Sequence, residues 1–195
     1  MGTNNSTISR IPEAEEIMQE TGFTPSHLTR LYDRFNVLDK DEKGFLSPKD
    51  FESIRELTFN PLGERIISAF FADGKDTLSF RSFVTILAHF RPLDKTRQPR
   101  DACSPEPINS RTSKLKFAFQ LYDQDKDGKI SRSELLQVLR MMVGVQVTNE
   151  QLESIADRTI QEADLDGDSA ISFEEFRKSL EKVNIDHKMS IRFLR

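Results

Sequence analysis

The stretch "DQDKDGKISRSE" (residues 123–134) places four carboxylates within twelve residues, and "DLDGDSAISFEE" (residues 164–175) repeats the arrangement. An ordinary acidic turn needs only one or two such residues. In the first stretch, oxygens come from positions 1, 3, 5, 7 (through the backbone carbonyl), 9 and 12, which are Asp123, Asp125, Asp127, Lys129, Ser131 and Glu134. A hard divalent cation takes six to eight oxygen ligands at about 2.3–2.6 Å. The spacing therefore predicts a calcium-binding loop.

The second stretch supplies an equivalent set of oxygens. Its ligand positions are occupied by Asp164, Asp166, Asp168, the carbonyl of Ala170, Ser172 and Glu175. Position 6, where the loop turns sharply and glycine allows a positive φ, is Gly128 in the first stretch but Ser169 in the second. A side chain at such a position costs about 1 kcal/mol, which weakens the site without removing a ligand. We therefore expect two calcium ions per chain.

Apolar residues at helical spacing flank these loops. Those around the first are Leu115, Ala118, Phe119 and Tyr122 on one side, and Leu135, Val138, Leu139 and Met142 on the other. A calcium loop between two helices is the EF-hand motif. Ile130 and Ile171 stand at position 8, where paired EF-hand loops form a short two-stranded contact.

Two further stretches keep the same frame without its ligands. In "DKDEKGFLSPKD" (residues 39–50), Lys43 puts a cation at position 5 and Asp50 is one methylene shorter than the usual closing Glu. "FADGKDTLSFRS" (residues 71–82) keeps little more than Leu78 at position 8. The sequence thus predicts an all-α fold of two EF-hand pairs with short paired loop strands, in which two of the four hands are degenerate.

Composition and spacing also indicate the domain organisation. We expect an N-terminal segment (1–23), an N-lobe (24–91), a proline-containing linker (92–113) and a C-lobe with a tail (114–195). The net charge of −4 does not favour a nucleic-acid partner. The single cysteine, Cys103, excludes an internal disulfide and fits a reducing compartment. No set of nucleophile and base suggests an enzyme, and no stretch resembles a membrane span or a secretory signal.

The chain contains fifteen phenylalanines, more than two small degenerate hands need in their cores. We therefore predict a groove for an amphipathic partner helix, lined by Phe83 and Phe90 from the second hand and by Leu139 and Met142 from the third. The alternative is that these helix faces form the core. At the N-terminus, "MGTNNS" fits the myristoylation pattern M-G-x-x-x-[ST] and predicts a myristoyl group on Gly2. One such chain gives only reversible membrane binding.

The whole pattern resembles the calcineurin B homologous proteins. The resemblance is carried by "ETGF" (20–23), "FNPLGERII" (59–67), "LAHFRP" (87–92), "EPINSR" (106–111), "LLQVLRMMVGV" (135–145), "SIADRTIQEAD" (154–164) and "KMSIRFLR" (188–195). It implies an N-myristoylated regulatory subunit that holds a juxtamembrane cytoplasmic helix of a plasma-membrane Na⁺/H⁺ exchanger in a hydrophobic cleft. Such subunits support exchanger stability, trafficking and intracellular pH control. It also implies that the inter-lobe insert takes part in exchanger binding.

The same resemblance leaves other functions open. The first alternative is an inhibitory or regulatory subunit that binds the calcineurin catalytic subunit, and others are a vesicle-trafficking calcium adaptor and a plain calcium buffer. The implied location is the cytoplasm and the inner face of the plasma membrane, with the nucleus and secretory-pathway membranes as further sites.

Overall fold

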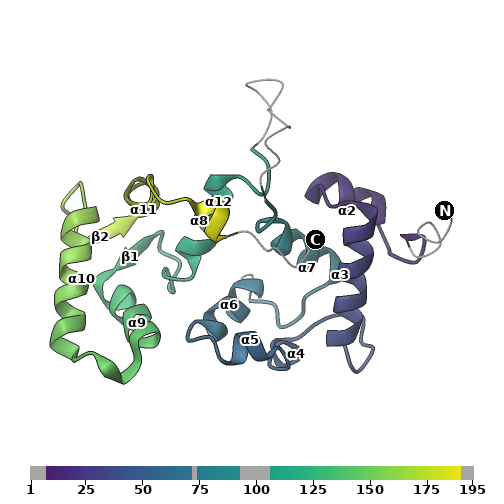
Figure 1. Cartoon of the computed structure of the whole chain (residues 1–195), viewed down its shortest axis with the longest axis horizontal. Coiled ribbons are helices and arrows are strands. Elements are labelled where there is room, and N and C mark those ends of the chain that lie inside the picture. Colours follow the sequence, from purple (N-terminus) through teal and green to yellow (C-terminus); the bar gives the residue numbers. More distant parts are fainter. Residues whose placement is uncertain (1–7, 72–73, 93–105, 190–195) are drawn as a thin grey trace.

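The structure, a computed structural model, describes residues 8–71, 74–92 and 106–189. Its elements form two helical groups, with α8 and α12 between them (Figure 1). The N-terminal group comprises α2 (Ala14–Thr21), α3 (Pro25–Leu38), α4 (Pro48–Phe51), α5 (Arg55–Thr58), α6 (Gly63–Phe70) and α7 (Phe80–Ala88). The C-terminal part comprises α8 (Arg111–Gln120), β1 (Lys129–Ser131), α9 (Arg132–Val143), the 3₁₀ turn η1 (Gly144–Gln146), α10 (Asn149–Ala163), β2 (Ala170–Ser172), α11 (Phe173–Ser179) and α12 (Ile185–Lys188).

The loops pair through their position-8 residues, as the spacing predicts. Strands β1 and β2 run antiparallel, with Ile130 opposite Ile171. In the N-lobe, Leu46 and Leu78 form an isolated bridge with N···O distances of 2.9 and 2.7 Å. The predicted all-α EF-hand fold with short paired loop strands is therefore confirmed.

Each lobe has its own hydrophobic core. Phenylalanines dominate the N-lobe core, where rings meet edge to face or tilted: Phe35, Phe51, Phe70, Phe80 and Phe83. The C-lobe core joins Phe119 and Ile130 to α9, α10 and Ile171. Many of the phenylalanines that suggested a groove therefore pack inside the N-lobe, where edge-to-face pairs add to the gain from burial.

The N-terminal segment is not separate from the N-lobe. Helix α2 packs on α7, and Ile11 and Ile17 are buried in the N-lobe core. Arg81 of α7 forms ion pairs with three glutamates, which are Glu13, Glu16 and Glu20. The domain boundary expected at residue 23 would therefore separate α2 and the loop before it from the N-lobe core to which they belong. Their helical spacing (Ile11, Ala14, Ile17, Thr21) was available in the sequence as a signal.

The end of the expected linker (92–113) also belongs to the fold. The side-chain oxygen of Ser110 accepts a hydrogen bond from the Ser113 N–H and caps α8. Asn109 is buried and its Nδ2 donates to the carbonyl of Pro92 at 3.0 Å. The expected boundary at 113 thus lies inside α8, while residues 93–105 are outside the described part of the chain.

None of the helices in the described ranges combines the length and the apolar character needed to cross a bilayer.

Candidate functional site

Backbone N–H groups gather the carboxylates of the third hand. Asp123 accepts from the N–H of Asp127 at 3.2 Å and from that of Gly128 at 3.1 Å. Glu134, at the start of α9, accepts from the N–H of Gln124 at 2.7 Å through Oε1 and from the N–H of Ser131 at 2.8 Å through Oε2. One carboxylate oxygen from each of Asp123, Asp125 and Glu134 lies within 4.8 Å of the others.

The fourth hand repeats this framework. Asp164 accepts from the N–H of Gly167 at 2.7 Å and from that of Ser169 at 2.8 Å. Glu175 accepts from the N–H of Leu165 at 2.7 Å through Oε1 and from that of Ser172 at 2.8 Å through Oε2. In this loop the three carboxylates that converge within 4.8 Å are Asp164, Asp166 and Asp168.

The remaining predicted ligands lie around these groups. Asp127 and Glu175 belong to the loops but fall outside the two three-carboxylate groups. Lys129 and Ala170, predicted to offer carbonyls, are the first residues of β1 and β2. Ser131 and Ser172 cap the exit helices, and the hydroxyl of each donates to the closing glutamate, at 2.7 and 2.8 Å. In each loop, the closing glutamate is therefore both a member of the capping box and a predicted calcium ligand.

The electrostatics of the loops suit a cation. Burial raises the pKa of the Asp123 carboxyl, and the charges of Glu134 and Asp127 raise it further. Hydrogen bonds from the N–H of Leu165, then from the N–H and hydroxyl of Ser172, lower the pKa of Glu175 to about 2. The closing carboxylate is therefore ionised at neutral pH, while a nearby cation would relieve the repulsion around Asp123.

Oxygen-only donors and several ionised carboxylates fit a calcium ion. When bound, such an ion would supply the positive charge that holds both ends of a loop together. Among the described residues, no comparable three-carboxylate group forms in the loops at 39–50 and 71–82.

A salt bridge connects the two calcium loops. The Lys129 ammonium, at position 7 of the third hand, contacts the carboxylate of Asp168, at position 5 of the fourth. This contact and the β1–β2 pairing couple the two loops side by side. A cation in the fourth loop therefore competes with Lys129 for Asp168.

Ser169 adopts a positive φ of 67°, as its place at position 6 predicts. We expect Ser169→Gly to raise the melting temperature of the calcium-loaded protein by about 2–4 °C, because glycine removes the left-handed strain. The reverse change, Gly128→Ala, should lower it by a similar amount. A Cβ at Gly128 would meet no atom within 4 Å, so only backbone strain opposes it (φ 86°). Calorimetric melting of both variants measures the effect, and equal melting temperatures would contradict it.

The four residues predicted to line a groove do not come together. Phe83 is only 6% exposed and lies in the N-lobe core, so it offers no free face. Phe90 packs edge to face on Phe117 of α8, with ring centroids 4.8 Å apart. Leu139 is half-buried against the C-lobe core, and Met142 is 53% exposed.

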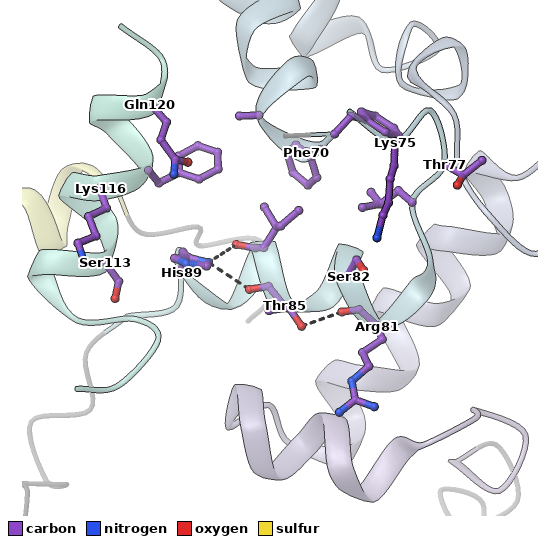
Figure 2. A pocket seen from close by; sticks show the side chains of 15 residues that line it. Phe70, Lys75, Thr77, Arg81, Ser82, Thr85, His89, Ser113, Lys116 and Gln120 are labelled. Atoms are coloured by element: carbon purple, nitrogen blue, oxygen red, sulfur yellow. Dashed lines mark hydrogen bonds between the residues drawn. The ribbon is translucent and has the colours of Figure 1, made fainter. Parts of the chain in front are cut away.

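Instead, a cavity of about 510 Å³, called here the central cleft, lies between α6, α7 and α8 (Figure 2). Its apolar lining comprises Phe70, Phe71, Leu78, Ile86 and Phe117. Its cationic side chains are Lys75 and Lys116; His89 also lines it, whereas the guanidinium of Arg81 is paired with three glutamates. None of the described residues that line it is an Asp or a Glu, although the chain has a net charge of −4.

The central cleft was not predicted because its helix face is mixed in polarity. Helix α7 and the residue after it present Ser82, Thr85, Ile86 and His89 to the cleft, at positions i, i+3, i+4 and i+7. Spacing alone marks this face, whereas the hydrophobic pattern of α7 marks its buried side, which includes Phe80, Phe83 and Val84.

Arg65 connects the N-lobe to the third hand. Its guanidinium, mostly buried, donates to the carbonyl of Leu121 at 2.7 Å and to Gln137 Oε1 at 3.1 Å. Leu121 is the C-cap of α8 and lies two residues before Asp123, and Gln137 lies on the exit helix α9. The arginine therefore contacts both helices that flank the first calcium loop. The sequence offered no signal for this contact, which joins residues far apart along the chain.

Comparison with known proteins agrees with this architecture. Residues 112–181 match the family model of an EF-hand domain pair, and residues 31–54 match that of an EF hand. The calcineurin B subunit of Naegleria gruberi is 44% identical over 193 residues, which cover 98% of this chain and 99% of that protein. The type 2 calcineurin B subunit of Dictyostelium discoideum is 36% identical over 195 residues (99% and 98%), and the calcineurin B subunit of Candida glabrata is 38% identical over 179 residues (92% and 94%).

Proposed function

Because the chain belongs to the calcineurin B family, we propose that it is the calcium-binding, non-catalytic regulatory subunit of a calcineurin-type phosphatase. Its partner is the calcineurin catalytic subunit. The EF-hand pair at residues 112–181 is the calcium-binding part of this assembly. The similarity to calcineurin B subunits extends over nearly the whole chain, including the two degenerate hands, which supports a shared architecture rather than an isolated shared motif.

The observation that carries the proposal is the central cleft. Helices of the N-lobe and the first helix of the C-lobe contribute to one cavity, whose apolar residues are accompanied by basic ones. An amphipathic helix of the catalytic subunit, with an apolar face and acidic flanking residues, has the complementary chemistry. Direct contact at the cleft and calcium at the loops are then separate functions of one subunit.

The Na⁺/H⁺ exchanger role that the sequence resemblance implied is the second candidate. The relatives named above are calcineurin B subunits, so they favour the phosphatase, while both partners would present an amphipathic helix. Calorimetric titration of the full chain, in calcium and in chelator, with a helix peptide from each partner separates the two. Tighter binding of the catalytic-subunit peptide is the expected result, and a clear preference for the exchanger peptide would overturn it.

Two calcium ions per chain, in the loops at 123–134 and 164–175, are part of the proposal. Three-carboxylate groups in both loops and the ordered closing glutamates support this number. Competition titration against a fluorescent chelator measures both the number and the affinity of the ions.

We also propose that Gly2, which lies outside the described residues, carries a myristoyl group and gives reversible attachment to a membrane. The protein would then be cytoplasmic and peripheral at the plasma membrane, with exchange to the nucleus or secretory membranes. Intact mass spectrometry of protein from eukaryotic cells should find one myristoyl increment, which Gly2→Ala removes. An unmodified wild-type chain would contradict this proposal.

A further inference from the structure

The first hand keeps the internal hydrogen bonds of the calcium loops although its ligand set is incomplete. Asp39 accepts from the N–H of Lys43 at 3.0 Å and from that of Gly44 at 2.7 Å. This matches the bonds of Asp123 to positions 5 and 6 of the third hand. Asp50 Oδ2 accepts from the N–H and the hydroxyl of Ser47, both at 2.7 Å. The loop is therefore ordered in the conformation of a calcium loop.

The closing residue of the first hand differs from those of the calcium loops in its partners. In the calcium loops, Oε1 of the closing glutamate accepts from the N–H at position 2, whereas in the first hand that N–H, of Lys40, donates to the carbonyl of Leu38. The shorter Asp50 is instead reached by the Lys43 ammonium, at 3.0 Å from Oδ2 and 3.4 Å from Oδ1.

The Lys43 ammonium lies among the negative charges of its own loop, closest to Asp50. Besides Asp50, it lies 3.9 Å from Asp41 Oδ2, and Asp39 adds a third nearby negative charge. These residues stand at positions 12, 3 and 1 of the loop. The side chains of Lys43 and Asp50 are 27% and 11% exposed, whereas that of Asp41 is 77% exposed, so the contact with Asp50 is the better shielded of the two.

We propose that Lys43 is a built-in cation, which occupies the metal position of the first hand and holds its loop in the paired form without calcium. An ammonium brings one charge and three hydrogen-bond donors, fewer interactions than a calcium ion makes. Its covalent attachment offsets this difference, because the cation is present at a high effective concentration under all conditions.

The consequence is a division between the lobes. The first loop supports the Leu46–Leu78 bridge, and residue 78 lies two residues before α7, which lines the central cleft. The N-lobe wall of the cleft is thus ordered at every calcium concentration. Only the C-lobe responds to the ion.

Two substitutions test this inference against a matched control. Lys43→Met removes the positive charge of the proposed built-in cation. Lys40→Met makes the same change elsewhere in the loop. Lys40 is exposed, and no ion pair of Lys40 is found among the described residues. We expect Lys43→Met to lower the melting temperature by about 2–4 °C more than Lys40→Met, in calcium and in chelator alike. Equal melting temperatures of the two variants would overturn the stabilising role of the ammonium.

The double variant Lys43→Asp with Asp50→Glu tests the metal position itself. It restores carboxylates at positions 1, 3, 5 and 12, so calorimetry should find one calcium ion more than in the wild type, with folding checked by circular dichroism in calcium. In chelator, this variant should melt below the wild type because no cation relieves its repulsion. An unchanged number of bound ions would overturn the identification of the Lys43 site with the metal position.

Discussion

Replacing Glu134 or Glu175 by Gln is expected to reduce the bound calcium from two ions to one per chain, with the affinity of the altered loop falling on the order of 100-fold or more. The closing carboxylate offers two charged oxygens, and an amide offers one neutral oxygen. The hydrogen bonds to the N–H groups of Gln124 and Leu165 also pin these oxygens, so a weaker acceptor loosens the loop as well. Calorimetry and chelator competition on each variant and on the double variant measure the loss.

Glu174→Gln provides the control for this experiment. Glu174 is adjacent to Glu175 but pairs with Arg177 on the surface of α11, where its side chain is 71% exposed. The substitution should leave both the number and the affinity of the ions within about twofold of the wild type, since exposed ion pairs contribute little. If Glu134→Gln and Glu175→Gln behaved as this control does, the loops would not be the calcium sites.

The parts of the molecule predicted from the sequence are those in which chemistry fixes residue types at set positions. A calcium loop requires oxygens at alternate residues and a closing carboxylate, so Asp123 and Glu134 are recognisable without a structure. Pairing of the loops follows from the same frame, and Ile130 lies opposite Ile171 as expected.

The parts that were not predicted depend on which surface covers a helix. Phe83 belongs to a clear apolar stripe, but the stripe does not tell whether α2, α3 or a partner lies on it. In the structure, helices of the N-lobe cover this stripe, and α2 joins the same core through Ile17. The central cleft likewise depends on α7 and α8, which the chain separates by the segment 89–110. A local sequence pattern does not show that two helices so far apart in the chain form one cleft.

The structure links this cleft to the calcium loops through α8. Phe117 lines the cleft, and Asp123 follows the end of the same helix. Arg65 holds that end through the carbonyl of Leu121. Calcium in the third-hand loop would therefore act next to the helix that forms one wall of the cleft.

The other large effect is expected at the cleft. Ile86→Asp should weaken binding of the catalytic-subunit helix by about 2–4 kcal/mol, or roughly 30- to 1000-fold, in calcium. Ile86 is half-buried and faces the cleft from α7, so a charge there would be desolvated by an apolar partner. Calorimetric titration of the full-length variant with the helix peptide measures the effect, after circular dichroism has established that the variant folds.

Val37→Asp is the matched control for this substitution. Val37 is 71% exposed on α3 and does not line the cleft, so its replacement should change the affinity by less than about twofold. Unchanged affinity of a folded Ile86→Asp variant would exclude the cleft as the docking surface. The partner would then have to use another face, and Met142, exposed on α9, is the predicted residue that remains accessible for it. Since Met142 lies on the exit helix of the third hand, that alternative would make calcium in a single loop control the docking surface directly.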